Sequence, residues 1–218
     1  MADKIFSLVS DAVRSKGFGV KKASRSDVAN ALQSEGIDIE NYNFSMLDGK
    51  KDLYIDAYES GDDIFLYKGY GNTQALCHEF IHKWWKKKGN EAYKKKIKEM
   101  FPEKWNEISN NEEYSVILED EMEICGEVLA KSYEEELKDY ILEHKDEIKS
   151  PDFLNSIGSK MHEKKISQLN VDDITEILAY DLFNGKRWYE GNDVPKPNDK
   201  EKKFSFAYGG YGKHTFWF

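Results

Sequence analysis

The chain has 218 residues, enough for one domain with a buried core, or for one domain with appendages. Its net charge of −9 argues against nucleic-acid binding as the main task, and no apolar run approaches the ~18 residues of a membrane span. The first residues lack a signal peptide's charged start and long apolar stretch, and two cysteines make no disulfide framework, so we expect a cytoplasmic protein that does not bind a membrane.

The first half of the chain predicts two short helices and then a β-hairpin. The helices are expected at residues 4–16 and 26–34, the second capped by Ser24 or Ser26. Residues 53–58 and 63–67 are rich in β-branched and aromatic side chains. The Gly- and Asp-containing turn between these two runs favours a hairpin.

Residues 73–88 predict a buried helix. Asn72 or Thr73 can serve as its N-cap, and Gly89 supplies the C-terminal stop. Apolar side chains cover most of its surface, namely Leu76, Cys77, Phe80, Ile81, Trp84 and Trp85. A helix of this kind should be buried, so its polar side chains need an explanation.

The helix carries the most informative motif of the chain, His78-Glu79-Phe80-Ile81-His82. Histidines four apart lie on one helix face, where both imidazoles can reach a single ion, usually Zn²⁺. Glu79 falls beside the open coordination position and can take a proton from water there. The alternative is two core histidines bonded to backbone carbonyls. The motif favours metal-assisted hydrolysis.

A long helix rich in Glu, Lys and Leu is expected over residues 112–149, and one of its glutamates could supply a third ligand. Its most apolar stripe is formed by Val116, Glu123, Ala130, Leu137 and Ile141. Glu123 lies near the centre of this stripe and Glu119 at its edge. Glu127 lies on the other shoulder, in line with Asp120 and Glu134. Helix geometry therefore favours Glu123 only mildly over Glu119 and Glu127.

Small residues on this helix, Gly126 and Ala130, leave room for the histidine-bearing helix to approach. Each cysteine, Cys77 and Cys125, lies within two residues of a proposed ligand, and we expect both to be buried thiols. Further helices are expected at 91–100, from Pro102, at 151–164 and at 172–183.

The chain ends in an unusual aromatic segment. Residues 194–203 contain two prolines and several charges and are typical of an exposed linker. Residues 204–218 predict a hairpin around Gly209-Gly210, with Tyr208 opposite Tyr211. Because an isolated hairpin is marginal in water and exposed rings promote association, this tail should dock on its own domain, a partner or a second copy. A further alternative is that it occludes the cleft, with His214 near the metal.

The motif helix resembles the active helix of the zincin metallopeptidases. Trp85 and Lys88 stand where the metzincin pattern requires glycine and histidine, which leaves the gluzincin arrangement with a glutamate on a later helix. The segment Glu123-Ile124-Cys125-Gly126-Glu127 resembles the Glu-x-x-x-Glu ligand helix of lethal-factor-type gluzincins, in which the first acid binds zinc. The resemblance implies Zn²⁺ held by His78, His82 and Glu123, with Glu79 as general base.

The resemblance also implies where a peptide substrate would lie. In zincins a strand before the active helix forms a sheet edge that binds the substrate, and this strand corresponds to Ile64, Phe65, Leu66 and Tyr67. A second donor to the oxyanion is expected. We favour Tyr114, on the helix of Glu123, and the other candidates are Tyr180, Tyr189, Arg187 and His162.

Together these observations predict a mostly helical α+β fold with a zincin-like core, in which a small sheet lies over the active helix and a ligand-bearing helix crosses beneath. Residues 1–193 would form this domain, 194–203 a linker and 204–218 the tail. The expected function is zinc-dependent hydrolysis of a peptide or protein. The alternative is a zinc-stabilised structural, assembly or partner-binding protein without turnover.

Overall fold

Helices dominate the structure, which is a computed structural model describing residues 4–34, 57–60, 62–67, 71–111, 120–162, 164–188, 205–207 and 216–217. The helices are α1 (Phe6–Ser15), α2 (Arg25–Ser34), α3 (Thr73–Lys88), α4 (Glu91–Met100), α5 (Pro102–Ser109), α6 (Glu121–Glu143), α7 (Pro151–His162), the 3₁₀ turn η2 (Ile166–Gln168) and α8 (Val171–Phe183). The strands are β1 (Gly19–Lys22), β2 (Ala57–Ser60), β3 (Asp63–Leu66), β4 (Ser205–Ala207) and β5 (Phe216–Trp217). The mostly helical α+β class is confirmed.

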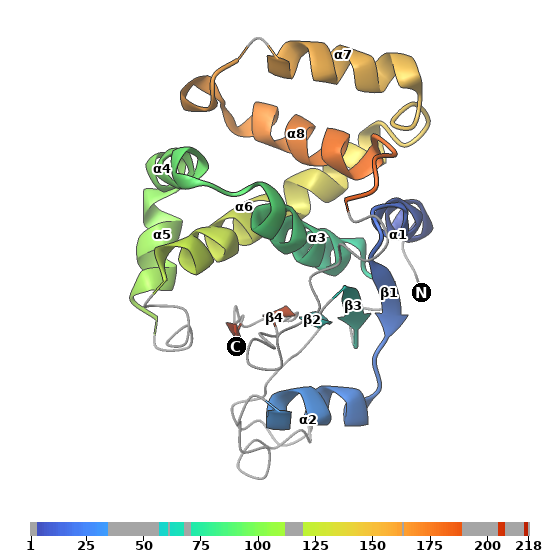
Figure 1. Cartoon of the computed structure of the whole chain (residues 1–218), viewed down its shortest axis with the longest axis vertical. Coiled ribbons are helices and arrows are strands. Elements are labelled where there is room, and N and C mark those ends of the chain that lie inside the picture. Colours follow the sequence, from blue (N-terminus) through green and yellow to red (C-terminus); the bar gives the residue numbers. More distant parts are fainter. Residues whose placement is uncertain are drawn as a thin grey trace.

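Helix α3 lies at the centre of this arrangement. It contacts the sheet through β2, β3 and β4, and it packs against α6 and α1 (Figure 1). Its predicted boundaries are confirmed, because the Asn72 side chain accepts a hydrogen bond from the Gln74 amide and the Gly89 amide donates to the Trp85 carbonyl. Every residue from Ala75 to Trp85 is buried.

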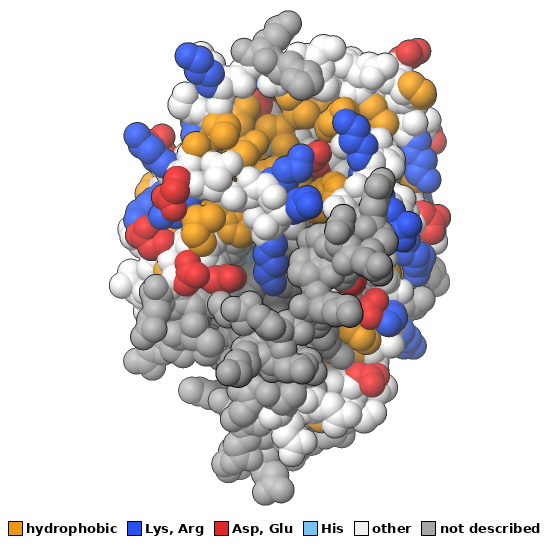
Figure 2. All heavy atoms as spheres, viewed as in Figure 1, with side chains coloured by type: hydrophobic (Ala, Val, Ile, Leu, Met, Phe, Trp, Pro, Cys, Tyr) orange, Lys and Arg blue, Asp and Glu red, His pale blue; other side chains and the backbone are white. Residues whose placement is uncertain are grey.

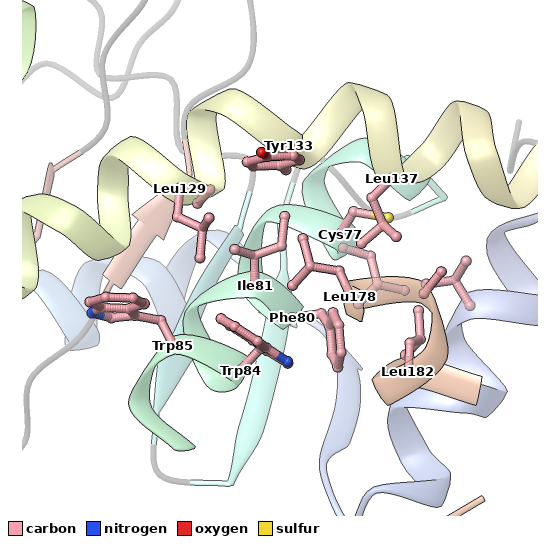
Figure 3. Packing of buried hydrophobic residues seen from close by; sticks show 14 of the residues in the cluster. Cys77, Phe80, Ile81, Trp84, Trp85, Leu129, Tyr133, Leu137, Leu178 and Leu182 are labelled. Carbon is pink, nitrogen blue, oxygen red and sulfur yellow. The ribbon is translucent and has the colours of Figure 1, made fainter. Parts of the chain in front are cut away.

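Apolar side chains of α3, α6 and α8 pack into one core. Figure 3 shows Phe80, Ile81 and Trp84 of α3 among leucines contributed by α6 and α8. Cys77 and Cys125 are buried free thiols, as expected, and burial raises the pKa of Cys125 to about 12. No helix in the described ranges is both long and apolar enough to cross a membrane.

The sheet has the strand order β1-β3-β2-β4-β5. The predicted hairpin is formed by β2 and β3, which pair antiparallel with Ser60 opposite Asp63. Residues 53–56 of the predicted first strand lie outside the described part. On the other side of β3, strand β1 pairs parallel to it, with Val20 opposite Ile64.

Strand β1 was not predicted, and it changes the position of β3 in the sheet. Within β1 only Val20 is buried, so the sequence carries little of the alternation that marks a strand. Because β3 pairs with β1 on one side and β2 on the other, it has no free backbone edge. The substrate-binding edge expected at Ile64, Phe65, Leu66 and Tyr67 is therefore not available at Ile64, Phe65 and Leu66, while Tyr67 lies beyond the end of β3.

The aromatic tail joins the sheet on its β2 side. Strand β4 pairs antiparallel with β2, placing Ala207 opposite Ala57, and β5 pairs with β4. Phe206 lies opposite Phe216, whereas a two-residue turn at Gly209-Gly210 would place it opposite Lys213. The predicted register is therefore off by three residues. The turn itself, with Tyr208 and Tyr211, and the linker 194–203 lie outside the described residues.

Helix α6 begins later and ends earlier than expected. The Asp120 side chain accepts a hydrogen bond from the Met122 amide, which caps a helix starting at Glu121. The helix ends at Glu143, with His144 as its C-cap. Glu119 and Tyr114, on the predicted first part of this helix, lie outside the described residues.

Candidate metal centre

The crossing of α3 and α6 is held in register by contacts at both ends. At one end, the Trp85 indole N–H donates to the Met122 carbonyl at 2.8 Å. A Cβ at Gly126 would lie 2.8 Å from the Trp85 ring, so only glycine permits this approach. At the other end, the Gln74 side-chain amide donates to Glu134 at 2.9 Å. The helices therefore run in opposite directions, with residues between these ends facing one another.

Between these two ends, His78, His82 and Glu127 converge. The Nε2 atoms of the two histidines are 2.9 Å apart, and Glu127 Oε2 lies 3.6 Å from His82 Nε2 and 3.9 Å from His78 Nε2. A tetrahedral zinc with bonds of about 2.0–2.1 Å spaces its ligand atoms about 3.3 Å apart. The observed separations bracket that value, so this buried group could hold a metal ion.

The third member of the group is Glu127 and not Glu123. Glu127 is 0% exposed, whereas Glu123 is partly exposed and lies one helical turn earlier, toward the end where Trp85 contacts Met122. The apolar stripe of α6 favoured Glu123, but the Trp85–Gly126 contact sets the crossing point one turn further along. In this geometry the third ligand position moves from Glu123 to Glu127.

A second acid, Glu134, supports the site by accepting a hydrogen bond from His78. Nδ1 of His78 donates to Glu134 Oε2 at 2.6 Å; when the His78 ring is neutral, Nε2 then carries the lone pair that a metal ion needs. Burial opposes ionisation of Glu134, but His78, Lys131 and the hydrogen bond from Gln74 outweigh it and lower its pKa to about 2. The seven-residue spacing of Glu127 and Glu134 places them on one line of the helix, and this spacing was the signal for the pair in the sequence.

The pKa values of the two histidines are shifted in opposite directions. Burial lowers the pKa of His82 well below its ordinary value, and the charge of His78 and nearby lysines lowers it further. Burial also acts against a charged His78, but its hydrogen bond with Glu134 and the charges of Glu134 and Glu127 raise its pKa overall. A neutral His82 is in the protonation state that a metal ligand needs.

The other predicted site residues fall into three groups. Glu79 follows His78 on α3, between the two histidines of the motif, and is 0% exposed. Tyr114 and Tyr189 lie outside the described residues, and the His162 side chain is likewise not described. Tyr180 and Arg187 line a different cavity, between α4, α7 and α8, and are not members of the metal-binding group.

No known protein family, curated protein sequence or solved structure matches this chain. Two histidines and one glutamate form a donor set that catalytic zinc sites use, with the fourth position left for water or substrate. The donor chemistry of His78, His82 and Glu127 fits such an ion.

Changing Glu134 tests its supporting role. Glu134→Ala removes the acceptor that orients His78, and metal affinity is expected to fall about 10–100-fold. Glu134→Gln keeps an acceptor oxygen without the charge, so its metal affinity should lie between those of the parent and of Glu134→Ala. A competition titration against a chromophoric chelator measures both, with exposed Glu135→Ala as the matched control. Equal affinities of Glu134→Ala and the parent would show that His78 needs no such partner.

Proposed function

We propose that this chain is a zinc-dependent metallopeptidase of the zincin type, acting on a peptide or protein substrate. The observation that carries the proposal is the convergence of His78, His82 and Glu127 at one buried helix crossing, with Glu79 between the two histidines in the sequence. A glutamate in this position of a His-Glu-x-x-His helix is suited to general-base work.

A Zn²⁺ ion bound there would polarise the scissile carbonyl and lower the pKa of nearby water. His78 and His82 present their Nε2 atoms from one face of α3, and Glu127 supplies a negative charge from α6. Glu134 holds His78 in the tautomer that leaves Nε2 free to bind. Glu79 takes a proton from the attacking water and later passes it to the leaving amine.

The full chain can be tested directly on an unfolded protein substrate. It should hold about one zinc per chain, lose turnover when a chelator removes the metal and regain it when zinc is restored. The double variant His78→Ala/His82→Ala should have neither zinc nor turnover. A full zinc content in that variant, measured by elemental analysis, would place the metal elsewhere.

One observation favours a second candidate function, a structural metal centre without turnover. His78, Glu79, His82 and Glu127 are each at most 1% exposed, so substrate and water would need a movement of the surrounding chain to reach them. Structural zinc sites are closed in this way. Such a centre would bind zinc and lose stability on chelation, but the zinc-loaded protein would cleave no peptide.

The tail offers a way to test how a substrate could reach the site. Extended peptides bind by adding a strand to a sheet edge, and β2 is the strand beside α3 whose outer edge is paired with β4. A chain ending at Asp199 lacks β4 and β5. We expect it to keep its zinc and to cleave an unfolded protein faster, because the β2 edge becomes available to substrate.

Two controls accompany the truncation. A synthetic peptide of residues 200–218, added in trans, should lower the turnover of the truncated chain again. Size-exclusion chromatography should be run on both chains, because loss of the tail could change self-association. Unchanged turnover together with unchanged size in solution would show that the tail has neither role.

A further inference from the structure

A cavity of about 600 Å³ lies between the C-terminal end of α3, helices α4, α7 and α8, and the segment 184–188. None of the metal-binding residues lines it. On the face seen in Figure 2, hydrophobic side chains gather over the region of α7 and α8, and lysine or arginine side chains stand among them. The cavity is therefore a separate feature that the proposed peptidase activity does not explain.

Its lining is strongly cationic although the chain is acidic. Five cationic side chains contribute, namely Lys87, Lys88, Lys164, Lys186 and Arg187, against one carboxylate, Asp181. The whole chain carries a net charge of −9. Charges of one sign around a recess focus the electric field and raise the local concentration of counter-ions. The lining therefore favours an anionic ligand.

Two of these cations remain available for a ligand. Lys88 pairs with Asp181 at 3.4 Å, Lys164 pairs with Asp173, and Lys87 donates to the Trp188 carbonyl at 3.3 Å. The side chains of Lys186 and Arg187 are exposed and form no ion pair within the part of the chain that the structure describes. An arginine guanidinium can bind a phosphate through two parallel hydrogen bonds, with lysine as a point charge beside it.

The segment that carries Lys186 and Arg187 is held in place by a buried lysine. Lys16, which is 0% exposed, donates through Nζ to Asn184 Oδ1 at 2.6 Å and to the Lys186 carbonyl at 3.1 Å. The Trp188 amide donates back to the Lys16 carbonyl. Burial lowers the pKa of Lys16 to about 8. In most molecules at neutral pH the Lys16 side chain is therefore still protonated. The two available cations are thus presented on a fixed support.

Apolar and aromatic side chains form another part of the cavity lining. Tyr93 of α4 and Ile177 and Tyr180 of α8 line it. Gly158 of α7 lets the Tyr180 ring approach closely, since a Cβ there would lie 3.3 Å from it. Such a wall can bind a flat ring, because stacking on aromatic side chains is favourable for any planar base.

We propose that this cavity binds a small organic phosphate carrying a flat ring, such as a nucleoside phosphate. The phosphate contacts Lys186 and Arg187, and the ring lies against the wall that Tyr93 and Tyr180 form. The volume suits one small molecule, since ligand pockets span about 300–1,000 Å³. The proposal does not depend on the peptidase function.

Calorimetric titration of the full chain with ATP, inorganic phosphate and adenosine tests both halves of the site. ATP should bind more tightly than either fragment, and its affinity should fall as salt rises from about 0.05 to 0.15 M. Lys186→Glu/Arg187→Glu should lower the affinity for ATP by about tenfold or more, because two charge-assisted contacts are lost. The control Lys145→Glu/Lys149→Glu makes the same change of charge at exposed positions outside the cavity and should have little effect.

Several outcomes would overturn the proposal. They are the absence of ATP binding by the parent, equal weakening by the two double variants, and a glutamate-rich peptide binding more tightly than ATP. Inorganic phosphate binding as tightly as ATP would remove the role of the aromatic wall. Because all four substituted side chains are exposed, circular dichroism should show an unchanged fold; the single variant Arg187→Ala repeats the test with a smaller change.

Discussion

Glu127→Ala is expected to abolish most of the metal affinity of this chain. Glu127 Oε2 lies within 3.9 Å of the Nε2 atoms of His78 and His82 and is the only carboxylate in the buried group found among the described residues. Its loss would remove one of the three proposed ligands and the only negative charge that this group would offer to a bound ion. Loss of an outer-shell partner lowers metal affinity about 10–100-fold. Loss of Glu127 itself should therefore lower the zinc affinity by more than about 100-fold.

The matched control is Glu123→Ala, one helical turn away on the same helix. Glu123 is partly exposed and stands outside the metal-binding group, so its removal should change zinc affinity little. His82→Ala serves as the positive control. A zinc titration in which Glu123→Ala is more damaging than Glu127→Ala would mean that the first acid of the Glu-x-x-x-Glu segment is the ligand, as the family resemblance implies.

Glu79→Gln should separate chemistry from metal binding. The amide keeps the shape of the side chain but cannot accept the proton from the attacking water. Turnover on an unfolded protein is expected to fall by roughly two to four orders of magnitude. Zinc content should be unchanged, because the direct ligands and their helix crossing remain.

The outcome of that substitution distinguishes the two proposed functions. Equal cleavage by Glu79→Gln and the parent would show that Glu79 is not the base, even if zinc is needed. If neither protein cleaves any substrate while both hold zinc, the closed environment of the site points to a structural centre. Thermal unfolding of the zinc-loaded and chelated protein would then measure what the metal contributes to stability.

The local parts of the fold could be predicted from the sequence because their causes are local. Helix α3 begins after Asn72 and ends before Gly89, and each of these residues forms a hydrogen bond to a residue within four positions. Glu91–Met100 is helical as expected. The spacing of His78 and His82 places both rings on one side of any helix, wherever that helix packs. The hairpin of β2 and β3 likewise pairs residues close in sequence.

Long-range packing decided the rest. Which glutamate faces His78 and His82 depends on the register of two helices, and that register is set by Trp85 against Gly126 and by Gln74 against Glu134. Nothing in the periodicity of α6 alone contains this information, so the apolar stripe favoured Glu123.

Long-range contacts also decided the strand order of the sheet. Strand β1 pairs with β3 more than forty residues later in the chain, and β4 pairs with β2, which lies about 150 residues earlier. A strand's local pattern can indicate that it is extended, but not which edge it will join. The sequence by itself therefore determined the two histidines, the general-base candidate and their helix. Only the tertiary structure placed Glu127 and Glu134 beside them, because those contacts form between segments that the chain brings together on folding.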